Sequence, residues 1–178
     1  MKKIVIIIFI LAFVVSVSFF IYNEIVADAF RYSTPEEAFE KSKPYNARLV
    51  DVFEDFNVAM LVYKRSDGAF SDHIIFKEER GWTSLKVTFA RKQFHALTDG
   101  FVDAKTIQGK TIVTFRFLLA KEEQIPTISD SLNTSFNSGS YEANSGRILV
   151  CGFGVLQQDF TDDYTLYIGE QKIVLANS

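Results

Sequence analysis

ILVCGFGVL, at residues 148–156, is the stretch that decides the fold, because it presents no charged side chain on either face. A strand that faces solvent on one side alternates apolar and polar residues, whereas a strand covered on both sides is apolar throughout. The stretch is short and contains β-branched and aromatic residues, which favours a strand over a helix. It therefore predicts a strand buried on both faces, with Gly152 and Gly154 inside it.

The segments around this strand follow a period of two, which indicates further strands. Residues 111–119 alternate apolar and polar side chains around Phe115. A segment rich in Ser, Asn and Gly, 129–147, predicts a long loop with room for one short strand. The strands expected in this half of the chain are 101–106, 111–119, 148–156, 164–168 and 173–175, the last two forming a hairpin.

The sequence DFTDDYTLYI, at 159–168, resembles the penultimate strand of immunoglobulin-like sandwiches. In those folds an acidic turn precedes a tyrosine whose hydroxyl bonds to upstream backbone. The resemblance extends from Phe101 to Ala176 and makes Tyr164 this corner residue. It implies a β-sandwich but no antibody-type domain, because the chain has one cysteine and its single tryptophan, Trp82, lies outside this part.

The part of the chain before Asp99 predicts an antiparallel meander. Alternation is clearest at Leu85, Val87 and Phe89, and the turn Ser66-Asp67-Gly68 separates two of the expected strands. The meander is expected to contain four strands, at 49–53, 58–63, 70–76 and 85–89.

A short helix is expected before the meander. Thr34 is suited to cap it, Pro35 has the backbone angle of a first helical turn, and Glu37 completes a capping box. Pro44 ends the element. Because a helix of two turns is not stable alone, we expect it to pack on the sheet.

The predicted fold is therefore mainly β, with an N-terminal transmembrane helix, one short helix, an antiparallel β meander and then an immunoglobulin-like β-sandwich. Asp99-Gly100 is the best boundary between the two β regions, and the alternative is a hairpin turn at the same place. The expected parts are a cytoplasmic tail at 1–3, a transmembrane anchor or uncleaved signal at 4–22, a stalk with the short helix at 23–45, an antiparallel β region at 46–98, and a sandwich-like region at 99–178.

The anchor prediction depends on the uncharged run from Ile4 to Tyr22. As a helix this run spans roughly 28 Å, against about 30 Å of bilayer hydrocarbon. Lys2 and Lys3 place the N-terminus in the cytoplasm and the rest of the chain outside. The alternative is a secretory signal cleaved after Ala29, because Ala27-Asp28-Ala29 has the small-x-small form of a cleavage site.

Composition narrows the cellular setting and the partners. The formal net charge of −3 argues against nucleic acid, which demands clustered Lys and Arg. An exported chain with one cysteine has no internal disulfide, which suits a bacterial envelope. The pattern of two lysines, apolar run and YSTPEEAF (32–39) resembles small uncharacterised membrane-anchored envelope proteins of Bacillus-like bacteria, a resemblance that implies no activity.

One enzymatic hypothesis pairs Cys151 with His95 or His73, as thiolate nucleophile and base of an exported hydrolase or transpeptidase. Sortases are exported, anchored β-barrel enzymes of this kind, but their arginine on a following strand has no counterpart after Cys151. The apolar neighbours of Cys151 are expected to raise the pKa of its thiol. We therefore favour a buried, inert cysteine and strand-face or surface histidines.

Other candidate sites are weaker. Ser129-Asp130-Ser131 lacks the Gly-x-Ser-x-Gly elbow of a nucleophile, so capping or turn hydrogen bonds are expected there. Asp159, Asp162 and Asp163 offer carboxylate oxygens to Ca²⁺ but without the EF-hand spacing. The sequence predicts no metal ion and no cofactor.

The aromatic content is high, and some of it is expected either in a phenylalanine-rich core or in an exposed recognition patch. Phe136 and Tyr141, which lie among Asn, Ser and Gly, are the first candidates for such a patch. The leading functional prediction is a non-catalytic binding or interaction module of the bacterial cell envelope. Its expected partners are the lipid bilayer, through residues 4–22, and an envelope protein or a wall component.

Overall fold

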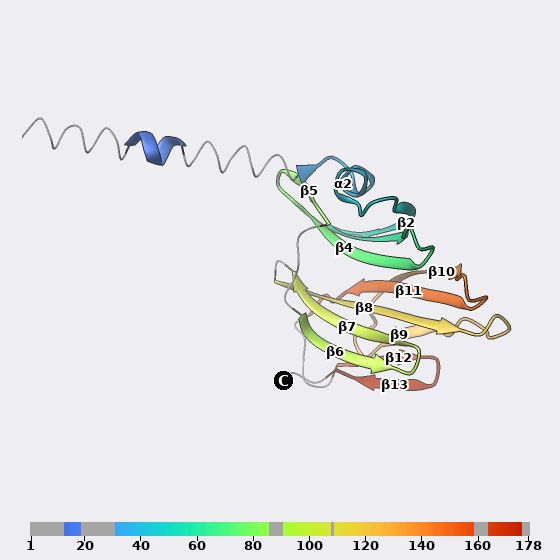
Figure 1. The fold of residues 1–178 in the computed structure, drawn as a ribbon. Coiled ribbons are helices and arrows are strands. Elements are labelled where there is room, and N and C mark those ends of the chain that lie inside the picture. Colours follow the sequence, from blue (N-terminus) through green and yellow to red (C-terminus); the bar gives the residue numbers. More distant parts are fainter. Residues whose placement is uncertain (1–12, 19–30, 86–90, 108, 159–163, 176–178) are drawn as a thin grey trace, which may run out of the picture.

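The computed structural model describes residues 13–18, 31–85, 91–107, 109–158 and 164–175 (Figure 1). Within these residues, no helix has both the length and the apolar character that crossing a bilayer requires. The predicted anchor at 4–22 lies outside the described part except for residues 13–18, which are helical. The predicted cleavage motif at 27–29 also lies outside it.

In the described part of the chain, helix α2 (Pro35–Ser42) and three antiparallel sheets form four layers (Figure 1). The outer sheet has the order β1-β5-β4-β3-β2, the central sheet β10-β11-β8-β7-β6, and the small sheet β13-β12-β9. The chain is therefore mainly β and antiparallel, as predicted.

The strands of the outer sheet are β1 (Arg31–Tyr32), β2 (Arg48–Asp55), β3 (Val58–Lys64), β4 (Phe70–Glu78) and β5 (Gly81–Thr83). Those of the central sheet are β6 (Arg91–Leu97), β7 (Gly100–Ile107), β8 (Lys110–Leu119), β10 (Phe136–Glu142) and β11 (Ile148–Val155). The small sheet contains β9 (Ile128–Asp130), β12 (Thr165–Ile168) and β13 (Gln171–Val174).

The central sheet is covered on both faces, because it lies between the other two sheets. Phe115 and Val150 belong to the core that it shares with the small sheet, whereas Cys151 and Phe153 belong to the core that it shares with the outer sheet. Neighbouring strand residues thus enter different cores, which requires an apolar residue at nearly every position. The prediction that 148–156 forms a strand buried on both faces is confirmed, with β11 ending at Val155.

The two glycines of β11 make room for aromatic rings. A Cβ at Gly152 would lie 2.6 Å from Phe115 Cζ, and a Cβ at Gly154 would lie 2.8 Å from two ring carbons of Phe136. The Phe115 and Phe136 rings meet edge to face, with their centroids 5.9 Å apart. Glycine is therefore required because two rings lie directly on the strand and because the Asn137 carbonyl oxygen would lie 2.4 Å from a Cβ at Gly152.

Helix α2 covers the far face of the outer sheet, where Ala38 and Phe39 are buried against Leu61 and Trp82. Its start is the predicted one, since the Thr34 hydroxyl accepts a hydrogen bond of 3.1 Å from the Glu37 amide and Pro35 opens the first turn. The Glu37 carboxylate, however, accepts from the Ser33 amide at 2.9 Å, one residue before the cap. The Ser33 hydroxyl donates to the same carboxylate oxygen at 2.5 Å, and this hydrogen bond, together with that from the amide, lowers the pKa of Glu37.

The predicted boundary at Asp99-Gly100 falls in a hairpin, because β6 and β7 pair from Leu97 and Gly100 onward. The chain passes from the outer to the central sheet earlier, between Thr83 and Arg91. The β region expected at 46–98 therefore contributes to two sheets. The fourth meander strand expected at 85–89 lies outside the described residues except for Leu85, and β5 occupies the fourth place.

The polar segment 129–147 contains more structure than a long loop. It includes the end of β9 and all of β10, which pairs with β11 along its whole length. Ser138, Ser140 and Glu142 are exposed on β10, so its polar residues alternate on an edge strand.

We expect Gly154→Ala to lower the free energy of unfolding by about 1–3 kcal/mol, because its new methyl group would overlap the Phe136 ring. Phe136→Leu in the same chain should restore part of this loss. A double-mutant cycle measured by chemical denaturation should then give a coupling of at least about 0.5 kcal/mol. Strictly additive effects would show that Phe136 does not lie on Gly154.

Candidate functional site

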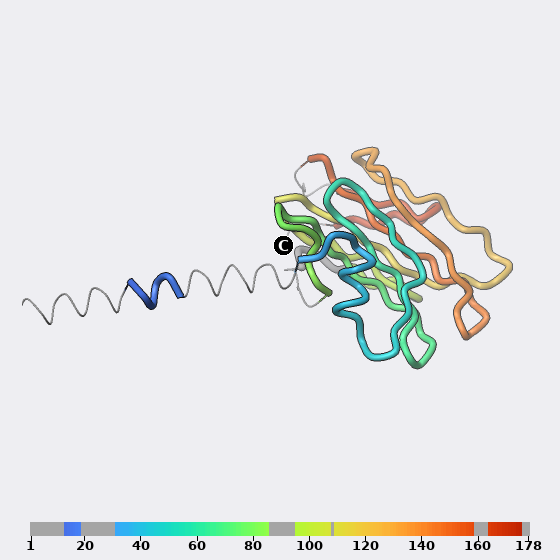
Figure 2. Tube along the Cα trace, turned by 90° about the horizontal axis from the view of Figure 1, so that it is seen from above, coloured from blue at the N-terminus to red at the C-terminus, as the bar shows by residue number. Residues whose placement is uncertain are grey.

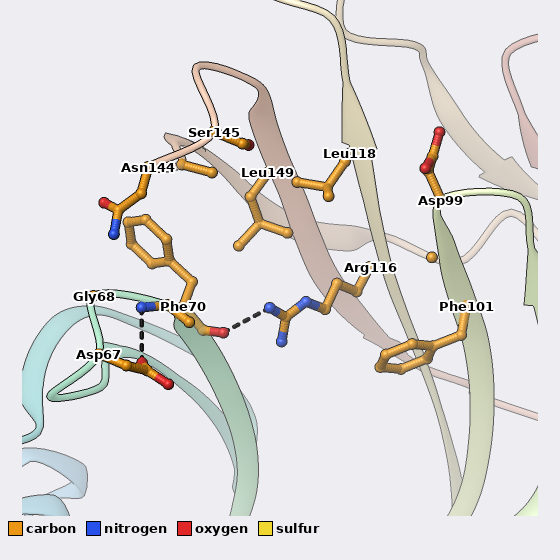
Figure 3. Close-up of a pocket in the computed structure, with 13 residues that line it drawn as sticks. Asp67, Gly68, Phe70, Asp99, Phe101, Arg116, Leu118, Asn144, Ser145 and Leu149 are labelled. Atoms are coloured by element: carbon orange, nitrogen blue, oxygen red, sulfur yellow. Dashed lines mark hydrogen bonds between the residues drawn. The ribbon is translucent and has the colours of Figure 1, made fainter.

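An open cleft of about 330 Å³ lies at one end of the interface between the outer and central sheets (Figure 3). We call it the inter-sheet cleft. Its apolar walls are Phe70, Phe101, Leu118 and Leu149, and its rim includes Asp67, Gly68, Asp99, Asn144 and Ser145. Three hairpin turns therefore meet around one opening, those between β3 and β4, β6 and β7, and β10 and β11.

The turn between β3 and β4 is closed by local hydrogen bonds. The Arg65 amide donates to the Ala69 carbonyl at 2.8 Å, and the Ala69 amide donates to Asp67 Oδ1 at 3.0 Å. Gly68 has a φ of 80°, and a Cβ there would lie 2.3 Å from the Asn144 amide nitrogen. The positive φ favours glycine in this turn, and the missing Cβ leaves room for the Asn144 side chain on the turn of the central sheet.

The opposite side of the rim is held by Arg147. Its guanidinium donates to both Asp99 carboxylate oxygens, at 3.0 and 2.8 Å, and to the Leu118 carbonyl at 2.9 Å. Hydrogen bonding to Arg147 lowers the pKa of Asp99. This bidentate geometry is the strongest form of the Arg–carboxylate pair, so it fixes two of the three turns relative to each other.

Arg116 crosses the interface beside the cleft. It projects from β8 in the central sheet, and its Nη1 lies 2.9 Å from Asp72 Oδ1 on β4 of the outer sheet. Its Nη2 donates to the Phe70 carbonyl at 2.6 Å, as the dashed line in Figure 3 shows. One half-buried guanidinium therefore joins the two sheets.

Tyr141 makes a second polar connection between the same sheets. Its hydroxyl donates to Asp51 Oδ2 at 3.0 Å, and its ring stacks on Phe70 with a centroid distance of 5.5 Å. Burial and the neighbouring Asp51 carboxylate raise the pKa of this hydroxyl, so it remains a donor. Tyr141 thus lies between the sheets, on strand β10 and not in a polar loop.

Cys151 lies inside this interface as the register partner of Arg116. Its side chain is fully buried, and burial together with the Asp72 carboxylate raises the pKa of the thiol to about 12. The guanidinium of Arg116 opposes this shift but does not overcome it. A nucleophilic cysteine needs a thiolate and access to substrate, and Cys151 has neither at neutral pH.

The structure does not bring either histidine to Cys151. His73 is paired with Leu61, whose side chain belongs to the core beneath α2, on the opposite face of the outer sheet. His95 is exposed and is paired with Val102, whose side chain faces the small sheet. The proposed nucleophile and its two candidate bases therefore face three different sides of the layers.

The remaining predicted residues lie away from the cleft. Phe136 packs on the core between the central and small sheets. Asp130 Oδ1 accepts from the amides of Leu132 and Thr134 at 3.1 and 2.8 Å, which is the turn bonding expected around Ser129-Asp130-Ser131. Tyr164 is fully buried before β12, and burial together with Asp130 raises the pKa of its hydroxyl.

Among the residues that the structure describes, no three side chains of His, Cys, Asp or Glu gather as metal ligands. Asp159, Asp162 and Asp163 lie outside these residues.

Sequence reasoning placed Tyr141 in an exposed recognition patch, whereas the structure places it half-buried between the sheets and outside the cleft lining, and it missed Arg116 and the apolar walls. A signal for Arg116 was present, because it is the one charge between Thr111 and Leu119 and stands between Phe115 and Phe117. A cation at the centre of an apolar strand needs a partner, and here that partner is Asp72. The residues of the apolar walls gave no such signal, since phenylalanine and leucine in the sequence are as typical of a closed core as of an open cleft.

We expect Cys151 in the folded protein to react with a thiol reagent at pH 7.5 more than a hundredfold more slowly than in guanidinium. A thiol pKa near 12 leaves little thiolate at that pH, and burial restricts access further. The rate can be followed by mass spectrometry, with the unfolded chain as reference. Rapid reaction of the folded protein would contradict this placement of Cys151.

No family model, no curated protein and no solved structure matches this chain.

Proposed function

We propose that the chain is a non-catalytic binding module of the bacterial cell envelope and that the inter-sheet cleft is its recognition site. The observation that carries this proposal is an open apolar cleft whose rim is fixed by Arg147 and Asp99. A rigid opening with apolar walls and few polar groups suits an apolar side chain or ring of a partner. The partner is an envelope protein or a wall component.

The proposed module is held at the outer face of the membrane by residues 4–22. The uncharged run in the sequence supports this, and so do the described helical residues 13–18, among which Phe13 and Val15 are 70% and 60% exposed. An anchor suits this cleft. Burying one apolar side chain of a partner in the cleft contributes roughly 1.5–3 kcal/mol to binding, which is weak on its own. An anchor that raises the local concentration of the module near a membrane-bound partner would therefore increase binding substantially.

An immunoglobulin-like arrangement is proposed for the central and small sheets. Support comes from the face-to-face packing of two antiparallel sheets and from a buried tyrosine, Tyr164, at the start of the penultimate strand. An enzyme built on Cys151 is not proposed, because its thiol is buried and its candidate bases face other layers.

We expect the full-length chain, with residues 1–29 retained, to remain in the membrane fraction after high-salt washing of cells. An uncharged helix of this length is extracted by detergent but not by salt. Immunoblotting and intact mass measurement report fractionation and cleavage together. A salt-extracted chain that begins at Phe30 would contradict the anchor and favour the cleaved signal.

The cleft is tested by Ser145→Trp, because Ser145 is exposed on the rim and a large side chain there would fill the opening. We expect chemical crosslinking in intact cells to yield at least fivefold less partner adduct than with the native chain. Gln124→Trp is the matched control, since Gln124 is exposed on a loop that does not line the cleft. Equal adduct yields from both variants would remove the cleft as the recognition site.

A further inference from the structure

A second pocket, of about 630 Å³, lies between the α2–β2 loop and the β3–β4 turn. We call it the basic pocket. Its lining includes Lys43, Arg48, Lys64 and Arg65, together with Asn46 and Ser66. No carboxylate of the described residues lines it, although the whole chain carries a net charge of −3.

Two of these cations are placed directly opposite each other. Arg48 on β2 and Lys64 on β3 are register partners of an antiparallel pair. Like charges in this position destabilise the pairing of strands. Within the described part of the chain, neither Arg48 nor Lys64 has a carboxylate at ion-pair distance, so no ion pair with these residues offsets their repulsion.

Lys64 is further constrained by its surroundings. It is half-buried, and its Nζ lies 5.5 Å from the centroid of the Phe70 ring. A cation over an aromatic face lies in a partly desolvated place, where it interacts more strongly with an anion. Arg48, by contrast, is exposed. The pair therefore presents a half-buried ammonium group, that of Lys64, and a solvent-exposed guanidinium group, that of Arg48.

The other two cations have partners that an anion would displace at little cost. Lys43 pairs with Glu40 at 2.6 Å and Arg65 with Asp67 at 3.0 Å, and the carboxylates of both pairs are about half exposed. Exposed ion pairs of this kind contribute about 0–1 kcal/mol. Lys43 and Arg65 therefore add two further cations to the lining of the basic pocket.

The basic pocket lies far from the point where the chain enters the outer sheet. The chain enters at β1, where Arg31 Nε donates to Glu78 at 2.9 Å, and β4 runs from Phe70 beside the pocket to Glu78. This strand spans roughly 26 Å at about 3.3 Å per residue. Figure 1 shows β1 and β5 at one end of the outer sheet and the β3–β4 turn at the other.

We propose that the basic pocket binds neighbouring phosphate groups of a linear phosphate-bearing polyanion. Arg48 and Lys64 take one phosphate between them, and Lys43 or Arg65 takes the next. Guanidinium, ammonium, amide and hydroxyl groups all donate hydrogen bonds to phosphate oxygens. The choice of a polymer over a lipid headgroup rests on the proposed function, because a membrane anchor before Arg31 joins the domain at the opposite end.

The test uses the full-length chain in neutral-detergent micelles and inorganic polyphosphate as the probe. We expect binding at 50 mM salt that weakens steeply as salt rises, measured by calorimetry. The double variant Arg48→Gln, Lys64→Gln should bind at least tenfold more weakly. Lys77→Gln, Lys172→Gln is the matched control, because both residues are exposed outside the pocket and the change in net charge is the same. It should bind within twofold of the native chain.

Thermal unfolding separates lost binding from lost folding. Without polyphosphate, the Arg48→Gln, Lys64→Gln variant should have a melting temperature equal to or above that of the native chain, because the repulsion across β2 and β3 is removed. Polyphosphate should raise the melting temperature of the native chain and not that of the variant.

Four results would overturn the proposal. The first is that the native chain does not bind polyphosphate at low salt, and the second is that the control variant loses as much polyphosphate affinity as the Arg48→Gln, Lys64→Gln variant. The third is that the native chain binds free inorganic phosphate as tightly as polyphosphate. The fourth is that it binds phosphatidylglycerol vesicles through Arg48 and Lys64 but does not bind polyphosphate. The cleft has a separate readout. If Ser145→Trp has no effect on crosslinking but the native chain still binds polyphosphate, the cleft proposal alone has failed.

Discussion

The structure depends on burial of the central sheet on both faces. Strand β11 lies in the middle of four layers and has to fill one core with Val150 and another with Cys151 and Phe153. No polar side chain is tolerated along it, and two positions have to be glycine so that the rings of Phe115 and Phe136 can lie on the backbone. The outer and small sheets each pack an apolar face on the central sheet. Helix α2 then covers the other apolar face of the outer sheet.

The interface between the outer and central sheets is less uniform than the other cores. Arg116 with Asp72 and Tyr141 with Asp51 place polar contacts around Cys151. Half-buried ion pairs contribute little net stability, because desolvation offsets most of their attraction. Their geometry is specific, however, and we infer that it fixes how the two sheets are aligned and keeps the cleft open at one end.

Much of the fold could be predicted from local patterns. The strand at 111–119 alternates clearly, 148–156 is continuously apolar, and the start of α2 is encoded by Thr34 and Pro35. Strands β1 and β5 could not be predicted, because they are too short to show a period; β1 exists through pairing with β5, and β5 through pairing with both β1 and β4. Strand β10 was hidden by its composition, since an edge strand can carry Ser and Asn on its exposed positions.

The candidate site was harder to predict for a related reason. Arg116 and Asp72 are 44 residues apart, and nothing in the sequence says that β8 and β4 face each other across an interface. Likewise, Arg48 and Lys64 become opposed only through the pairing of β2 with β3, whose register shifts between Leu49 and Asp51. Pairwise geometry of this kind arises from tertiary packing, which a single sequence does not display.

The β3–β4 turn has a consequence for regulation, because Gly68 lines both the inter-sheet cleft and the basic pocket. One short hairpin, in contact with Asn144 across the sheets, is therefore shared by two proposed ligands. If the turn shifted on binding one of these ligands, the lining of the other site would change with it. By thermodynamic linkage, each proposed ligand would then change the affinity of the other by the same factor.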